Sequence, residues 1–346
     1  MKYMPIFRFR DSEKKVLESV AYSSKIIPLI EIIQEKRRSN MNVDCFDEIK
    51  SYIQSTGNRL FIDVPLYIKL KSNTAPNVAN FLRPILANPS LRLSYFNHFV
   101  GENIIPVVSY NPHTPLFQQN FISNEIMQLR NSFDQIAIRI SLNHAQSALN
   151  EASPYLIPND IIILDLDTTS HTDSSLVPFY QYIIDYAQQH QCQTVLVRAA
   201  ISPDTTNTGL TNNQVISTLD NTLLTNYSNY GFDAFGDYCG IKKDELTEGG
   251  SISPGCIFYH WWDNAYYGHK GIYKQAPTFT SMVVPSVMSS ISWNNYQTIS
   301  RQAHEHSCPG CRMISNIARG TEAGNSAPKW KIIISSHYLH TMEEFL

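Results

Sequence analysis

Short hydrophobic runs that end on a charged or titratable residue recur through the first 260 positions of the chain. Seven of them occupy residues 27–31, 60–63, 136–139, 161–165, 195–198, 235–237 and 257–260. Longer amphipathic stretches separate these runs, and runs of this length are typical of strands that are buried on both faces. The pattern predicts repeated βα units around a parallel sheet.

The spacing of the strands favours a closed barrel over a two-winged sheet. The nine strand candidates are Tyr3–Arg8, Ile26–Ile32, Arg59–Val64, Asn103–Tyr110, Gln135–Ser141, Asp160–Asp167, Gln193–Ala199, Phe232–Tyr238 and Cys256–Trp261. Helices are predicted over residues 11–21, 44–56, 75–97, 118–132, 143–152, 174–190 and 211–226. No Gly-rich loop for a dinucleotide or a phosphate follows any strand. We therefore predict an α/β fold, a (β/α)8 TIM-like barrel.

The ninth strand is one more than such a barrel uses. Turn residues after Trp261 predict an aromatic β-hairpin from Cys256 to Tyr273, or an extra strand that caps the barrel. From Ala276 onward the pattern changes, with a helix predicted over 293–306 and a strand over Lys329–His340. The prediction is a barrel domain over residues 1–275 and an α+β extension over 276–346 that packs on it.

Composition narrows the classes of function. The formal net charge is −3 and the sequence pI is about 6.4, so general binding to nucleic acid or to an anionic membrane is not expected. The first residues contain no apolar signal region, and no stretch approaches the roughly 18 apolar residues that span a bilayer. Six scattered cysteines fit a reducing compartment. These features predict a cytoplasmic protein.

The polar residues at the strand ends form the candidate site, because barrels bind their ligands at the carboxyl ends of the strands. Side chains at i and i+2 share a face of a strand, so each polar end lies one layer above an apolar residue. If the ends converge, the mouth of the barrel holds Glu31, Asp63, Asp165, Asp167, Asp237, Arg139, Arg198, Tyr238 and His260.

Two chemistries suit these residues. The carboxylates and His260 could hold Mg²⁺ or Mn²⁺ while Arg139 and Arg198 clamp phosphate oxygens, as in metal-assisted phosphoester cleavage. Alternatively, paired carboxylates could act as general acid and base without a metal, as in glycoside hydrolysis. The two arginines favour an anionic ligand and hence the phosphoester. The competing interpretation is that the charged ends are structural ion pairs that fix loops.

A second cluster lies near the C-terminus. His304, His306, Cys308 and Cys311 are four side chains that can bind zinc within eight residues, and Pro309 and Gly310 form a tight turn between the cysteines. Structural zinc sites usually take pairs of ligands from separate segments. A helix end followed by a turn therefore explains the cluster as well, and zinc stays one of two alternatives.

Several motifs in a fixed order resemble a known family. Tyr3-x-Pro5-Ile6, the run that ends at Glu31, and Phe235-Gly236-Asp237-Tyr238, followed by the aromatic hairpin around His260, resemble the beta-protein family of phages, prophages and bacterial genomes. The resemblance implies a protein of mobile elements, often encoded near genes of phage exclusion or toxin–antitoxin type. It implies no settled activity. Glu31, Asp237 and His260 lie within the matching motifs, whereas the other candidates rest on the strand-end argument.

Two hypotheses about function follow. The first is a barrel hydrolase that acts on a phosphoester or nucleotide-like ligand in phage–host conflict, with an anionic small molecule as its substrate. The second is a binding or sensor module that neutralises or triggers a toxin or effector, a partner protein from the same operon. In the second hypothesis the charges at the strand ends form a sensing pocket or plain ion pairs.

Overall fold

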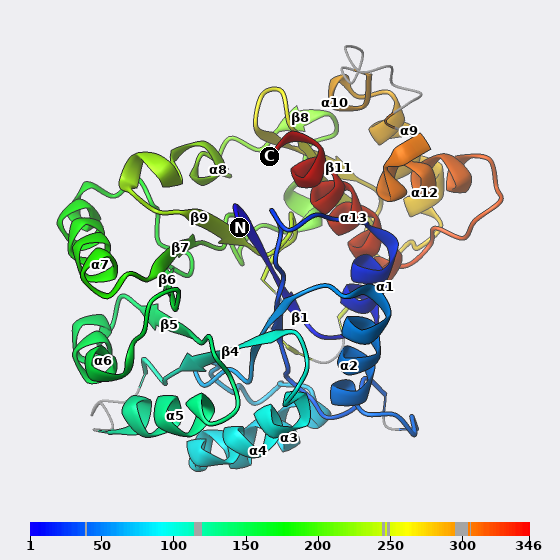
Figure 1. The fold of residues 1–346 in the computed structure, drawn as a ribbon. Helices are drawn as coiled ribbons and strands as arrows, with labels where there is room; N and C mark the ends of the chain where they lie inside the picture. Colours follow the sequence, from blue (N-terminus) through cyan, green and yellow to red (C-terminus); the bar gives the residue numbers. More distant parts are fainter. Residues whose placement is uncertain (39, 114–119, 244–245, 248–249, 295–303, 305) are drawn as a thin grey trace.

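The first eight strand candidates close into a parallel barrel (Figure 1). The computed structural model describes all residues except 39, 114–119, 244–245, 248–249, 295–303 and 305. The barrel strands, in order, are β1 (Tyr3–Arg8), β2 (Leu29–Glu31), β3 (Leu60–Asp63), β4 (Ile104–Ser109), β5 (Ala137–Ser141), β6 (Ile161–Asp165), β7 (Gln193–Val197) and β9 (Ala234–Asp237). β1 pairs in parallel with both β2 and β9, which closes the ring and confirms the predicted (β/α)8 fold.

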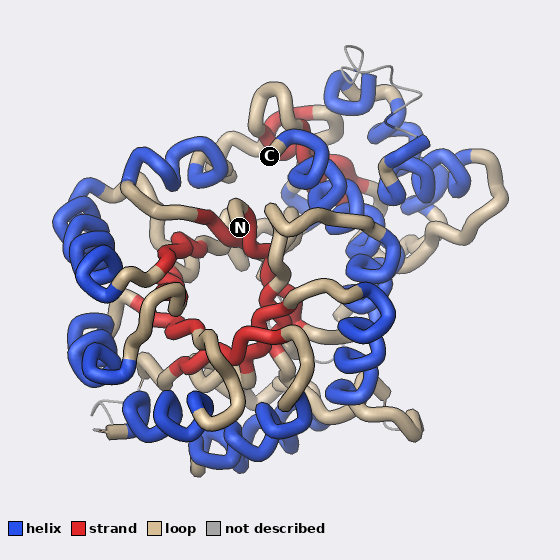
Figure 2. The backbone as a smooth tube through the Cα atoms, in the orientation of Figure 1, coloured by secondary structure: helices blue, strands red, loops and turns tan. Residues whose placement is uncertain are grey.

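Helices cover the outside of the barrel, as the blue tubes around the red strands in Figure 2 show. They are α1 (Asp11–Ser19), α2 (Cys45–Thr56), α3 (Pro76–Ala87), α4 (Arg92–Phe96), α5 (Phe121–Arg130), α6 (Ala145–Ala152), α7 (Val177–His190) and α8 (Leu223–Asn226). Local chemistry sets their ends. Asp44 caps α2 by accepting a hydrogen bond of 2.8 Å from the backbone N–H of Asp47. Gly57 ends the same helix in the left-handed region, at φ 70°.

Each barrel strand sends alternate side chains to two separate hydrophobic layers. The layer inside the barrel contains Met4, Ile6, Leu29, Phe61, Ile105, Val107, Ala137, Ile161, Ile163, Val195, Val197 and Ala234. The layer between strands and helices contains Tyr3, Phe7, Ile30, Ile62, Val108, Ile138, Ile162, Leu164, Leu196 and Phe235. Because neighbouring residues of a strand face opposite ways, position along the strand decides whether a polar end points into the barrel.

The ninth strand candidate forms the predicted hairpin. β10 (Gly255–His260) pairs antiparallel with β11 (Ala265–Lys270), and β11 also pairs with the two-residue strand β8 (Gln214–Val215). The helix predicted over 211–226 is therefore mostly wrong. Asn213 lies in the left-handed region at φ 55°, a conformation that an asparagine tolerates and that a helix does not contain.

The last part of the chain consists of helices joined by short loops in the residues that are described. It contains a π-helical turn (Phe279–Val283), α9 (Val284–Met288), α10 (Ile291–Asn294), α12 (Pro309–Ala318) and α13 (Ala327–Phe345). The strand predicted over Lys329–His340 is wrong, since these residues lie in α13. Residues 332–339 are all buried, so the helix lacks the one-sided apolar stripe by which a sequence reveals it. The helix predicted over 293–306 falls largely outside the described residues.

One buried carboxylate links helix α13 of this C-terminal part to the strands of the barrel. Asp237, at the end of β9, accepts hydrogen bonds of 2.6 Å from Tyr3 of β1 and 2.6 Å from Tyr338 of α13. The backbone N–H of Cys239 donates a third, of 2.8 Å. Gly240 allows the close approach, because a Cβ there would lie 2.8 Å from the ring of Tyr338.

We expect Tyr338→Phe to lower the free energy of unfolding by about 1–3 kcal/mol, because the buried carboxylate of Asp237 loses a donor. Chemical denaturation of the full chain measures this. Tyr273→Phe is the matched control, since Tyr273 is 51% exposed, and it should change stability by less than about 0.5 kcal/mol. Equal effects of the two substitutions would contradict the anchoring role of Tyr338.

Candidate active site at the barrel mouth

Alternation along the strands sorts the seven polar strand ends into two groups. Glu31, Asp63, Arg139 and Asp165 stand two residues beyond Leu29, Phe61, Ala137 and Ile163, which line the inside of the barrel. All four polar side chains are buried and meet at the mouth. Arg8 joins them from β1, where it pairs in register with Glu31. The strand-end argument therefore located four of the residues at the mouth.

The other three strand ends lie elsewhere. Asp237 follows Phe235 on the outer face, where it holds α13. Arg198 follows Leu196 on the same face and donates to the backbone carbonyl of Asp220 at 3.0 Å, which fixes a loop. His260 belongs to the hairpin and pairs with Asp263 at 2.6 Å. The prediction that these residues share the mouth with Glu31 is wrong, because neighbouring positions on a strand face opposite layers and β10 is not a barrel strand.

Arg139 is the centre of the mouth. Its Nη1 donates to Glu31 at 2.6 Å and to Asp63 at 3.3 Å. Its Nη2 donates to Asp165 at 2.6 Å and to the hydroxyl of Tyr238 at 3.4 Å, and its Nε donates to Asp165 at 3.0 Å. A guanidinium group has five N–H donors. All five are thus engaged with groups of the protein, which leaves no donor of Arg139 to clamp a phosphate in this arrangement.

Further buried charges complete the network from outside the strands. Arg92 of α4 donates to Asp63 at 3.1 Å and to Glu125 of α5 at 2.7 Å. Ser109 donates to Asp63 at 3.0 Å. Arg92 and Glu125 are almost fully buried, and the sequence analysis missed both. They stand on helices, where a charged residue carries no sequence signal that it points inward.

The pairing sets the charge of two carboxylates. Burial alone would raise the pKa of Glu31, but Arg139 and Arg8 lower it to about 2. Burial likewise opposes ionisation of Asp165, and Arg139 and Lys243 outweigh it, so its pKa is lowered. Both groups are anionic at neutral pH.

Two other carboxylates show the opposite shift. Burial raises the pKa of Asp63, and the nearby guanidinium groups of Arg92 and Arg139 offset this only in part. Burial raises the pKa of Glu125 to about 7 although Arg92 favours its charged form. Glu125 therefore titrates near neutral pH, unlike an ordinary glutamate.

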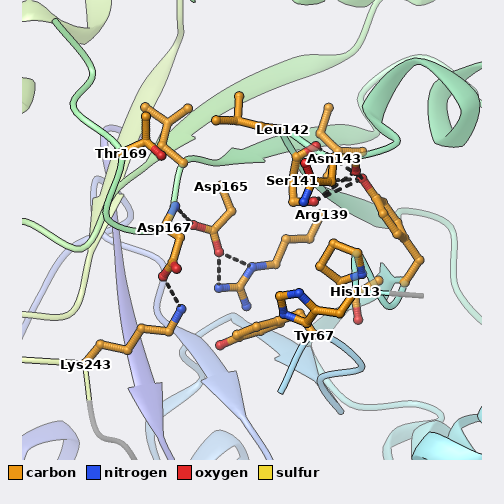
Figure 3. Close-up of a pocket in the computed structure, with 15 residues that line it drawn as sticks. Tyr67, His113, Arg139, Ser141, Leu142, Asn143, Asp165, Asp167, Thr169 and Lys243 are labelled. Carbon is orange, nitrogen blue, oxygen red and sulfur yellow. Dashed lines mark hydrogen bonds and ion pairs between the residues drawn. The ribbon is translucent and has the colours of Figure 1, made fainter. Parts of the chain in front are cut away.

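A cavity of about 260 Å³ opens above this network (Figure 3). Arg139, Asp165 and Asp167 line it together with Tyr67, Tyr110, His113, Ser141, Asn143, Thr169 and Lys243. Of the predicted ligand contacts, Arg139 and Asp167 thus lie at the cavity, whereas Arg198 does not line it. Tyr238 does not line it either, but its hydroxyl accepts a hydrogen bond of 3.4 Å from Arg139.

Lys243 reaches the cavity from the loop after β9. Its ammonium group lies 2.6 Å from Asp167, which is 62% exposed, and 4.7 Å from the centre of the Tyr67 ring. The guanidinium of Arg139 lies 4.5 Å from the same ring. Two cations thus contact one aromatic ring, an arrangement that the ring's negative face favours. Neither Lys243 nor Tyr67 is predicted from the sequence as a site residue, because both lie in loops.

The chain matches the model of the Beta protein family over residues 3–343. It belongs to this family. Comparison of this beta-family chain with curated proteins gives no match. Among solved structures, it is similar to a GH128 (subgroup I) endo-beta-1,3-glucanase from Amycolatopsis mediterranei in complex with laminaripentaose. The TM-score is 0.31 at 10% identity, over 68% of this chain and 88% of the glucanase chain, too low for an argument about the beta-family site.

At the mouth of the beta-family barrel, three of the carboxylates that are predicted to hold Mg²⁺ or Mn²⁺ already accept hydrogen bonds from other groups of the protein. Glu31 faces Arg139 and Arg8, Asp63 faces Arg92 and Arg139, and Asp165 faces Arg139 and the backbone N–H of Asp167. A cation would have to displace these donors and lie beside guanidinium charges. Among the described residues, groups with the spacing of metal ligands occur at the C-terminal part instead.

That C-terminal group differs from the predicted one in a single member. His304, Cys308 and Cys311 come together, and His337 of α13 joins them, whereas His306 is exposed and is not part of the group. The prediction for His306 is therefore not borne out by the geometry. Nearness in sequence favoured His306, whereas the fourth side chain, His337, lies 26 residues beyond Cys311. In the described residues, no helix is long and apolar enough to cross a membrane.

We expect Arg139→Met to destabilise the beta-family barrel by about 3–5 kcal/mol, because three buried carboxylates lose their shared partner. Denaturant unfolding measures the change. Arg38→Met is the control: Arg38 is 68% exposed in its ion pair with Asp11 and should contribute less than about 1 kcal/mol. A cost for Arg139→Met no larger than that of the control would contradict the central role of Arg139.

Because its pKa is raised, Glu125 makes the free energy of unfolding decrease as the pH rises. Its pKa of about 7 in the folded state exceeds the ordinary glutamate value of 4.5, so between these values the folded state binds more protons than the unfolded state. Its contribution to stability is present below about pH 4.5 and is lost as the pH rises through 7. We expect Glu125→Gln, relative to wild type, to gain about 1–3 kcal/mol between pH 5 and pH 8. A difference that does not change with pH would contradict this assignment.

Proposed function

We propose that this beta-family barrel is a binding protein that receives a small anionic ligand at the barrel mouth. The observation that carries the proposal is the pairing of charges. The carboxylates under the cavity are held by guanidinium groups, whereas Lys243 at its edge is paired with the largely exposed Asp167. Such a site offers a fixed recognition surface and one exchangeable cation.

Exchange at Lys243 is the least costly way to admit an anion. An ion pair with one exposed partner contributes little, usually below about 1 kcal/mol, so a ligand anion can replace the carboxylate of Asp167. The same replacement at Arg139 would leave a buried carboxylate unpaired, which costs several times more. The geometry therefore favours Lys243 as the anion contact.

The rest of the cavity suits a polar organic ligand of limited size. Ser141, Asn143 and Thr169 provide hydroxyl and amide groups, and Tyr110 and His113 provide flat surfaces. The volume of about 260 Å³ is close to the lower end, about 300 Å³, of ordinary small-molecule sites. A sugar phosphate or a nucleoside monophosphate has this combination of hydroxyl groups, size and charge.

Metal-assisted phosphoester hydrolysis has weaker support. That reaction needs a cation held by open carboxylate oxygens and an arginine available to the phosphate. At this mouth the carboxylate oxygens already accept hydrogen bonds, and the donors of Arg139 are engaged. We therefore favour a sensor over a hydrolase. The setting in phage–host conflict, with a toxin or effector encoded in the same operon as partner, extends the family resemblance and remains part of the proposal.

Lys243→Met tests the anion contact. We expect at least one compound in a panel of inorganic phosphate, sugar phosphates and nucleoside monophosphates to raise the Tm of the full-length protein. At a ligand concentration of 100 Kd the gain in stability is about 2.7 kcal/mol. Lys243→Met should weaken Kd about tenfold or more, as measured by calorimetry. Lys242→Met is the matched control, since the neighbouring Lys242 donates to the carbonyl of Pro203 and does not line the cavity.

Three results would overturn the proposal. Binding that Lys242→Met and Lys243→Met weaken equally, or no binding across the panel, would remove the anion contact. Turnover of the same compounds or of phosphodiesters with added Mg²⁺ or Mn²⁺, abolished by Asp165→Ala, would replace the sensor by the metal-assisted hydrolase.

A further inference from the structure

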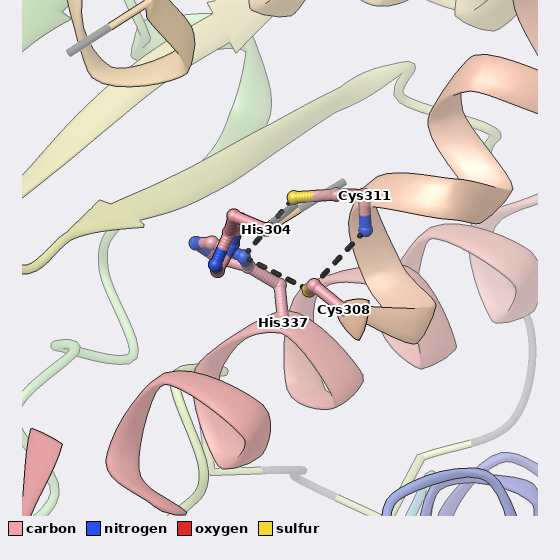
Figure 4. Close-up of side chains that lie close together, drawn as sticks. All are labelled: His304, Cys308, Cys311 and His337. Atoms are coloured by element: carbon pink, nitrogen blue, oxygen red, sulfur yellow. Dashed lines mark hydrogen bonds between the residues drawn. The ribbon is translucent and has the colours of Figure 1, made fainter. Parts of the chain in front are cut away.

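Four buried side chains with nitrogen and sulfur ligand atoms meet in the C-terminal part, away from the barrel mouth. His304, Cys308 and Cys311 approach His337 of α13 (Figure 4). All four are 0% exposed, and their ligand atoms lie within 4.8 Å of one another. Two short segments separated along the chain thus supply the ligands, as is usual for structural zinc sites.

The distances agree with the edges of a zinc tetrahedron. With Zn–S of about 2.3 Å and Zn–N of about 2.0–2.1 Å, a tetrahedral site places sulfur and nitrogen about 3.5 Å apart. The Nδ1 atom of His337 lies 3.5 Å from Sγ of Cys308 and 3.4 Å from Sγ of Cys311. Both thiols therefore stand where two thiolate ligands would stand relative to the imidazole.

Outer contacts orient both imidazoles for a metal. The Nε2 atom of His337 lies 2.9 Å from the backbone carbonyl of Tyr259, so it carries the proton and Nδ1 presents its lone pair to the thiols. The Nδ1 atom of His304 lies 3.0 Å from the carboxylate of Glu344, which places the lone pair on Nε2. Histidine ligands of zinc commonly have such a carbonyl or carboxylate partner on the other ring nitrogen.

The backbone conformation around Cys308 and Cys311 lets both cysteines lie close to His337. The N–H of Cys311 points at Sγ of Cys308 at 3.5 Å, a contact that favours a charged sulfur. Between them, Gly310 packs against α13, where an added Cβ would lie 2.4 Å from the carbonyl oxygen of Ile333 and 2.7 Å from the backbone nitrogen of His337. Any larger residue would push the cysteine turn away from His337.

We propose that His304, Cys308, Cys311 and His337 form a closed structural zinc site. Two thiolates and two neutral imidazoles balance the charge of Zn²⁺, so the complete site is neutral and suits a buried position. A closed set of four protein ligands leaves no open position for catalysis. The ion joins α13 to α12, and α13 in turn holds the barrel through Tyr338 and Asp237.

The alternatives are a metal-free cluster of thiol–imidazole hydrogen bonds and a disulfide between the two cysteines. Elemental analysis of the full-length protein, purified without a metal-affinity tag, separates them. We expect one zinc ion per chain, and in Co²⁺-loaded protein the d–d and thiolate charge-transfer absorption of a tetrahedral site with two sulfur ligands. A chelator should lower the Tm, and added Zn²⁺ should restore it.

Substitutions test which residues bind the zinc ion. Cys308→Ser with Cys311→Ser, and separately His337→Gln, should lose the zinc. His306→Ala should retain it, because His306 is exposed. Cys256→Ser should also retain it, because Cys256 is buried in the same hydrophobic cluster but is not in the group of four.

The proposal fails if wild-type protein contains no zinc and takes up none, or if mass analysis shows a Cys308–Cys311 disulfide in freshly isolated protein. It also fails if the cysteine variants keep the metal or if His306→Ala loses it. Should the cysteine variants not fold, the Co²⁺ spectrum of the wild-type chain still decides, since a spectrum without thiolate bands overturns the site.

Discussion

The fourfold pairing of Arg139 is the interaction on which the barrel mouth depends. The guanidinium group of Arg139, on β5, contacts carboxylates from β2, β3 and β6 and a tyrosine that follows β9. Buried carboxylates without a counter-charge would be strongly destabilising, and Arg139, together with Arg8 and Arg92, supplies the counter-charge inside the ring of strands. The same saturation determines what the mouth can do. It holds the carboxylates of Glu31, Asp63 and Asp165 in hydrogen bonds within the protein, and the proposed recognition uses the groups above the network.

A second constraint links the barrel to the C-terminal part. Helix α13 is buried along most of its length, and one of its turns carries Tyr338, which donates to Asp237 of β9. The adjacent residue, His337, faces Cys308, which caps α12, and Cys311 in its first turn. Neighbouring residues of one helix thus contact the barrel and the proposed zinc site. Disruption of either contact would weaken the other, because both depend on the position of the same helical turn.

The alternation of inward and outward side chains along each strand explains which site residues can be predicted from the sequence. Glu31, Asp63, Arg139 and Asp165 were found because each ends a hydrophobic run and shares a face with an inward apolar residue. Asp237 and Arg198 end similar runs but face the helices, and nothing in a fully hydrophobic strand tells the two faces apart. Arg92, Glu125 and Lys243 were missed because they reach the mouth from helices and a loop.

The sequence by itself determined the order of the βα units, the closed parallel barrel, the aromatic hairpin and the resemblance to the beta-protein family. Those features are local, since they follow from the length and spacing of hydrophobic runs. Only the tertiary structure decided that the charges at the mouth neutralise one another, and that His337 rather than His306 completes the Cys/His group. Both results depend on contacts between residues far apart in the chain, whose direction is set by packing and leaves no periodic trace in the sequence.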